Sequence, residues 1–86
     1  MTRLWAAGEP VTVTLNTAGR PTHLAWHGQR HTIAHIQQQW EVDTDWWDTR
    51  GRVWRVYFAA ITADGIFCVF YQDRLTEAWQ LSKLYD

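Results

Sequence analysis

Four histidines recur at every fourth residue, at positions 23, 27, 31 and 35. On a single helix this spacing would align four imidazoles on one face, an arrangement that can bind zinc. Gly28 interrupts the segment, however, and a hairpin turn at His27–Gly28 would place the first two histidines on one strand and the last two on another. No cluster of cysteines supplies further ligands. We therefore expect no metal site and assign these histidines to exposed strand or turn positions.

Cys68 is the single cysteine of the chain, so it forms no internal disulfide. A nucleophilic thiol needs a low pKa and an open, electropositive setting, whereas the flanks of Cys68 are apolar (IFCVF). We expect a small buried side chain here. Asp43, Asp45 and Asp48 could mimic a glycosidase or cation site, but carboxylates are common in loops near strand ends. Since no phosphate-binding, dinucleotide, hydrolase or metalloprotease motif is present, we expect a non-enzyme with no cofactor and no small-molecule substrate.

Aromatic residues alternate with arginines in the stretch WWDTRGRVWRVY at 46–57. Exposed aromatic rings can stack unpaired bases, each contributing about 1–3 kcal/mol, while arginine holds phosphates. The net charge of −1 excludes a uniformly basic surface, so any nucleic-acid contact must be local and should favour single strands over duplex. The candidate residues for binding nucleic acid or a partner are Trp46, Trp47, Arg50, Arg52 and Arg55.

Seven tryptophans are unusually many for 86 residues. In so short a chain, large aromatic rings are needed to build the core. We assign Trp26, Trp40, Trp54 and Trp79 to the core, and Trp5 with one of the adjacent pair at 46–47 to the surface.

The clearest structural pattern is a hairpin over residues 52–73. Two runs rich in β-branched and aromatic residues flank Ala63-Asp64-Gly65, a turn in which glycine suits the left-handed position. The resulting register places Arg55 opposite Asp73 and residue 57 opposite residue 71, with both faces apolar. Further strands are expected at 11–15, at 22–26, leading to the tight turn at 27–28, and at 78–86, where Trp79, Leu81 and Tyr85 share a face.

Residues 30–42 are ambiguous, because Ile33, Ile36 and Trp40 also fit a helical spacing. We favour a long strand, kinked or bulged near 37–39, over a short helical turn near 36–40.

These elements predict an all-β fold, an antiparallel meander of five or six strands curled into a small barrel or roll. Residues 1–10 are assigned to an N-terminal extension and 11–86 to a single β domain. No apolar run approaches the roughly 20 residues of a membrane span and no secretory signal is recognised, so we expect no membrane contact and a cytoplasmic location.

The order of several residues resembles a small bacterial domain of unknown function. The similar positions are Trp40, Trp46-Trp47, Arg52 to Val56, Gly65, Tyr71 to Arg74, Trp79 to Leu81 and Tyr85-Asp86. That domain is similar to the C-terminal module of the inactive Y-family polymerase-like subunit of the bacterial translesion mutasome. The resemblance implies a DNA-repair setting and a recognition role without catalytic residues. Glu77-Ala78 departs from it, standing where the family has a Gly-Arg-like turn.

We therefore expect a non-catalytic interaction or adaptor module that binds a DNA-repair protein or single-stranded DNA. The alternative is a self-associating structural domain, a homodimer that uses the apolar reverse face of the 52–73 hairpin and has no nucleic-acid role.

Overall fold

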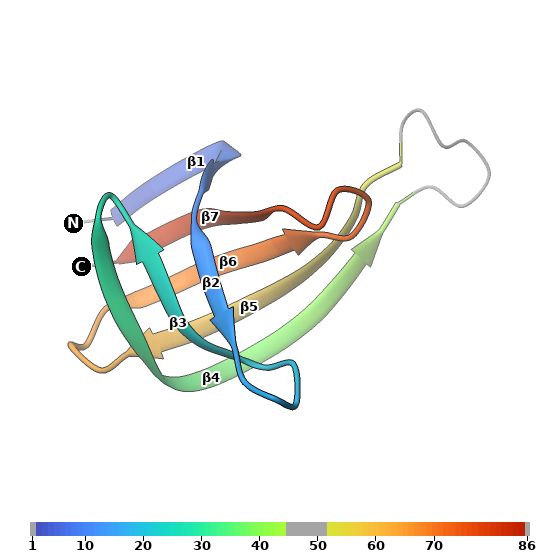
Figure 1. Cartoon of the computed structure of the whole chain (residues 1–86). Helices are drawn as coiled ribbons and strands as arrows, with labels where there is room; N and C mark the ends of the chain where they lie inside the picture. The colour runs from blue at the N-terminus through green and yellow to red at the C-terminus, as the bar shows by residue number, and fades with distance from the viewer. Residues whose placement is uncertain (1, 45–51, 86) are drawn as a thin grey trace.

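The computed structural model describes residues 2–44 and 52–85, which form seven antiparallel strands and no helix (Figure 1). Their order in the sheet is β1-β7-β6-β5-β4-β3-β2. The strands are β1 (Thr2–Pro10), β2 (Thr12–Leu15), β3 (Pro21–Trp26), β4 (Gln29–Asp43), β5 (Trp54–Thr62), β6 (Phe67–Asp73) and β7 (Trp79–Tyr85). The predicted all-β class and curled sheet are confirmed, with more strands than expected. The described residues contain no helix that could cross a membrane.

The β5–β6 hairpin has the predicted register, with Arg55 opposite Asp73 and Tyr57 opposite Tyr71. Gly65 adopts a φ of 88° in the turn, the left-handed conformation that glycine tolerates. Because directly opposite residues share a face, the two faces of the hairpin follow from this register. We call the face that carries Phe58 and Phe70 the inner face, and the face that carries Tyr57 and Tyr71 the outer face.

Strand β4 is continuous through residues 36–40, so the alternative of a helical turn there is wrong. Its register against β5 shifts twice, between Ile33 and His35 and between Ile36 and Gln38. Each shift inserts one extra residue, which changes the phase of alternation and creates an apparent helical spacing in the sequence. The second bulge coincides with the start of the predicted kink.

Residues 1–10, assigned to an N-terminal extension, supply strand β1, which pairs with β7. The register shifts between Leu4 and Glu9, and Gly8 in this bulge has a φ of 81°. A Cβ on Gly8 would lie 2.5 Å from the hydroxyl oxygen of Tyr71 and 2.1 Å from Oε1 of Gln80. The backbone of β1 therefore lies directly against the outer face, and only glycine permits this approach.

A bulge also changes which side chains of β7 face the core. The register shifts between Val69 and Phe70, where Lys83 and Leu81 are the successive partners on β7. As a result Leu81 and Leu84 are both buried, although they were predicted to lie on opposite faces, and Tyr85 is exposed.

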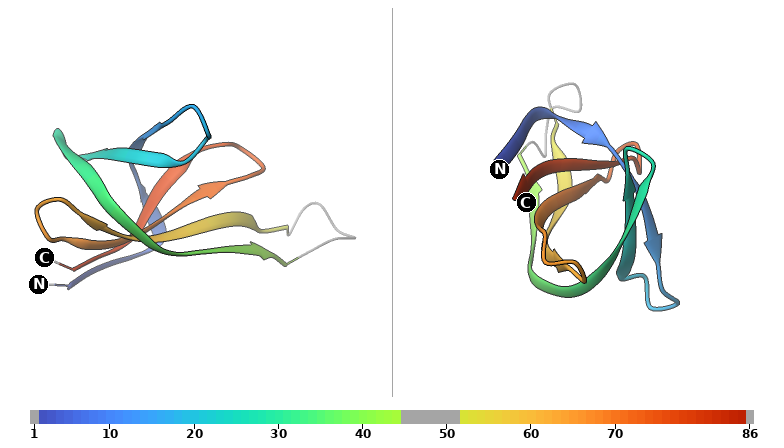
Figure 2. Two further views of the ribbon diagram at one scale, coloured as in Figure 1. Left: turned by 90° about the horizontal axis from the view of Figure 1, so that it is seen from below. Right: turned by 90° about the vertical axis from the view of Figure 1, so that its left-hand side faces the viewer.

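The core lies between the two halves of the curled sheet. Figure 2 shows β2 and β3 turned over so that they face β5–β7 across the interior. The buried cluster comprises Leu24, Phe58, Ala60, Cys68, Phe70, Leu81 and Leu84. Its centre is the ring pair of Phe58 and Phe70, whose centroids are 5.4 Å apart.

The division of the tryptophans between core and surface differs from the prediction. Trp26 and Trp79 pack against the buried cluster, as expected. Trp40 was assigned to the core, which is wrong, because it remains 39% exposed on the outer face, stacked on Tyr57 at 5.3 Å between ring centroids. Trp54 is half-buried outside that cluster. The side chain of Trp5, like Trp46 and Trp47, lies outside the described part of the structure.

Gly8→Ala and Gly19→Ala form a matched pair that tests the docking of β1. Both glycines have φ near 80°, but a Cβ at Gly19 meets no atom within 4 Å. Gly19→Ala should lower the free energy of unfolding by about 1–2 kcal/mol through backbone strain alone. Gly8→Ala should cost roughly 1–3 kcal/mol more, because β1 or the Tyr71 ring must move. Urea denaturation measures both, and equal losses would show that β1 does not contact Tyr71 as described.

Candidate partner-binding groove

Of the predicted site residues, Arg52 lies just before β5 and forms a forked ion pair with Asp43 at the end of β4. Its Nε and Nη2 donate to the two carboxylate oxygens of Asp43, at 3.1 and 2.8 Å. The guanidinium also covers the Trp54 ring, 4.6 Å from the ring centroid. Trp54 projects from the inner face, because side chains alternate along β5 and Trp54 is four residues before Phe58, which lies on that face.

Arg55 projects from the outer face. It lies 4.6 Å from the centroid of the Tyr71 ring, and its Nη1 donates to the Tyr57 hydroxyl at 3.2 Å. This hydrogen bond is the main reason that the pKa of Arg55 is raised. The structure thus places Arg52 and Arg55 over rings on opposite sides of the sheet, and it does not join them into one basic surface. The other candidates, Trp46, Trp47 and Arg50, lie outside the described residues.

A concave surface lies on the inner face, between the end of β2 with the turn that follows it and the far ends of β4–β7. We call it the distal groove. It has a volume of about 460 Å³. Its lining residues are Leu15, Gly19, Gln39, Val56, Phe58, Gln72, Arg74, Glu77 and Trp79. This volume is within the range of about 300–1,000 Å³ found for binding sites.

The groove exists because strands β2 and β3 are shorter than the strands they cover. At four and six residues, they extend over only part of the inner face of β5, which has nine residues. Beyond them Val56 and Trp79 are half-buried, and the Trp79 ring lies 5.8 Å from the buried ring of Phe58. Leu15, at the end of β2, is 43% exposed at the margin.

Polar groups form the rim of the distal groove. The indole Nε1 of Trp54 donates to Glu41 at 2.5 Å, and Arg74 lies 5.8 Å from the centroid of the same ring. Arg74 also donates to Oε1 of Gln72 at 2.9 Å. The described lining of the groove carries both signs, with Arg74 and Glu77.

Sequence reasoning missed this groove because its walls come from distant segments. Leu15 and Trp79 are separated by most of the chain, and only the fold of β2 over the sheet brings them to one surface. The short strand at 11–15, set against a long hairpin, was the available signal that part of the inner face stays uncovered.

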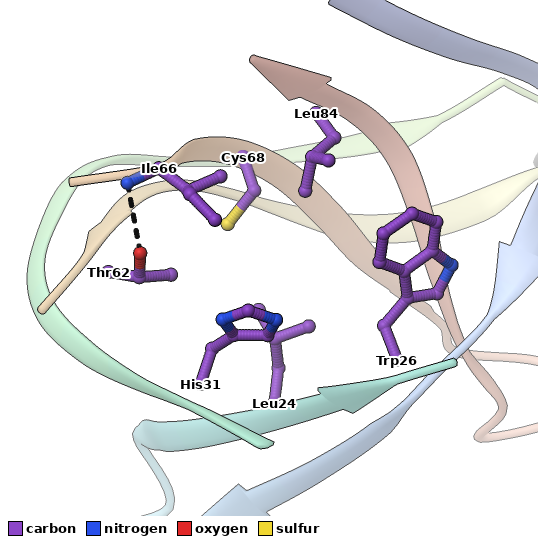
Figure 3. A pocket seen from close by; sticks show the side chains of 7 residues that line it. All are labelled: Leu24, Trp26, His31, Thr62, Ile66, Cys68 and Leu84. Atoms are coloured by element: carbon purple, nitrogen blue, oxygen red, sulfur yellow. Dashed lines mark hydrogen bonds between the residues drawn. The ribbon is translucent and has the colours of Figure 1, made fainter. Parts of the chain in front are cut away.

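A second, closed space lies inside the core near the β5–β6 turn (Figure 3). Seven side chains point into it: Leu24, Trp26, His31, Thr62, Ile66, Cys68 and Leu84. It encloses about 10 Å³, at the lower limit for a single water molecule. This space is a packing defect and not a ligand site.

Cys68 is fully buried beside this space, as predicted. Burial raises the pKa of its thiol to about 12, so it is protonated at neutral pH and is a poor nucleophile. His31 instead lies near Asp64, with Nδ1 and Oδ2 3.4 Å apart. The Thr62 hydroxyl donates to the same carboxyl at 2.5 Å, which is the main reason that the pKa of Asp64 is lowered. Together these contacts brace the turn.

Within 2–44 and 52–85, no three histidine, cysteine, aspartate or glutamate side chains are grouped so that they could hold a metal ion. Comparison with known proteins adds no family, since no protein-family model, curated protein or solved structure matches the chain.

Cys68 provides a direct test of the closed core. In the folded chain at pH 8 its thiol should react with a disulfide reagent at least about a hundredfold more slowly than in urea, because reaction requires opening of the structure. Since the pKa is higher in the folded state than in the unfolded state, stability should also fall as the pH rises above about 9. Rapid labelling under native conditions would contradict this burial.

Proposed function

We propose that this protein is a non-catalytic interaction module that binds a protein partner in the distal groove. The observation that carries the proposal is the distal groove, where Val56 and Trp79 stay half-buried beside the buried ring of Phe58. Exposed apolar surface with a polar rim is typical of interaction sites. The protonated state of the one thiol gives no support to a nucleophilic role for Cys68.

The charges at the groove favour a protein over single-stranded DNA. Of the described residues that line the groove, Arg74 is the one cation and Glu77 the one carboxylate, so this lining offers no net attraction to phosphates. Arg52 is already engaged by Asp43, and both arginines near the groove lie against the Trp54 ring. A partner with mixed charge and apolar side chains matches this surface better.

The resemblance to a module of the translesion mutasome supplies the setting of the proposal. A small domain that stands beside an inactive polymerase-like subunit would act by holding another protein in place. On this ground we assign the partner to the proteins of DNA repair, with single-stranded DNA as the rival ligand.

Self-association through the outer face of the hairpin has less support. The centre of that face is already buried within one chain, with Ala59, Val69 and Tyr71 between 3% and 8% exposed. What stays exposed is at its margins, including Trp40 and Tyr85. A homodimer would therefore gain less apolar burial there than the sequence predicts.

Titrating the isotope-labelled chain with indole tests the groove by NMR, because indole mimics a large apolar side chain. The largest amide shifts should cluster at Val56, Phe58, Gln72 and Trp79. A fluorescein-labelled oligothymidylate at low ionic strength should bind no tighter than about 100 μM. Indole shifts clustered around Trp40 on the outer face would contradict the site, and tight oligothymidylate binding would contradict the protein partner.

A further inference from the structure

The edge of the sheet at β2 is open. In the sheet order β2 is a terminal strand, with β3 as its single neighbour among the described strands. Its other edge begins with one backbone hydrogen bond, from the Val11 amide to the carbonyl of Trp79 at 3.2 Å. Beyond that bond β2 diverges from β7, and the distal groove opens between them.

The opposite edge of the sheet is protected, whereas β2 is not. Edge strands commonly carry prolines, charges or bulges that prevent pairing with another chain. Strand β1 contains a bulge, Gly8 and Pro10. Strand β2 has the sequence TVTL, without charge, proline or glycine, and its main protection is its length of four residues.

The inner face below this edge lacks part of its cover. Strands β3 and β2 form a layer over the inner face (Figure 2). The distal groove, which Leu15 of β2 and Trp79 of β7 line, occupies the next position in that layer beyond β2. A strand placed there would pair with β2 and would lie over Val56, Phe58 and Trp79. Every second side chain of such a strand would point to the apolar floor.

We propose that the partner contributes an extended peptide segment that adds to β2 as a further strand and fills the distal groove. This inference rests on the proposed function and specifies the form of its ligand. Backbone hydrogen bonds to β2 hold the segment, and large apolar residues at alternate positions bury against the floor.

Charge adds one element of specificity. Arg74 reaches the rim of the groove, where it contacts Gln72 and the Trp54 ring, and no carboxylate of the described residues pairs with it. An acidic residue of the segment would supply that partner. The expected ligand is thus a short extended peptide with alternating large apolar residues, at least one acidic residue and no proline.

The test is selection of random twelve-residue peptides displayed on phage against the full chain. The enriched peptides are then synthesised and measured by fluorescence anisotropy. They should share the alternating apolar pattern and an acidic residue. Methylating the backbone nitrogen at alternate positions should weaken binding about tenfold or more, while the intervening positions tolerate it, because only alternate amides face β2.

Leu15→Asp and Leu4→Asp are the matched variants, since both leucines are exposed, at 43% and 65%, and only Leu15 borders the groove. Leu15→Asp should weaken binding about tenfold or more, whereas Leu4→Asp should leave it within about twofold. Arg74→Glu should weaken binding of the acidic peptides. It should not weaken binding of the same peptides in which the acidic residue is replaced by its amide. Thermal unfolding checks that each variant is folded.

Each of the other outcomes overturns either the strand addition or both it and the proposed function. Groove-dependent binding that tolerates methylation at every position overturns strand addition and leaves the proposed function standing. No enriched peptide, or peptides bound equally by Leu15→Asp, overturns both. If the chain is a dimer at micromolar concentration and Leu15→Asp makes it a monomer, a second copy occupies the edge and the peptide inference is overturned.

Discussion

The contact between Phe58 and Phe70 across the β5–β6 hairpin, covered by Leu24 from β3, is the constraint on which the structure depends. It fixes which face of the hairpin is inner, and it requires the sheet to curl until β3 lies over that face. All three side chains are at most 6% exposed. A chain of this length has few other large buried groups, so the remaining strands arrange themselves around this contact.

Features set by local chemistry were predictable from the sequence, and features set by bulges were not. The hairpin register followed from alternation and the turn at Gly65, and the predicted tight turn at His27–Gly28 is present, with Gly28 at positive φ as expected and His27 at positive φ as well. The phase of β7 and the exposure of Trp40 were missed, because one inserted residue reverses every later side chain. Strand β1 was missed because its sequence does not alternate. The distal groove needed the tertiary fold.

The functional consequence lies in what the core leaves uncovered. Because β2 and β3 are short, the inner face continues beyond them as an apolar surface with Trp79 on its floor and Arg74 on its rim. The guanidiniums of Arg52 and Arg55 cover aromatic rings on opposite faces of the sheet. The groove, the free edge of β2 and the mixed charge together favour a peptide over a nucleic acid.

Residue-resolved amide hydrogen exchange tests this account most directly. Amides in β5 and β6 should exchange only through global unfolding. The alternate amides of β2 that face the distal groove should exchange orders of magnitude faster. Such a pattern means that β2 is paired on one edge and open on the other. Uniformly slow exchange across Thr12–Leu15, comparable to that of β6, would show that the edge is already covered and would contradict the account.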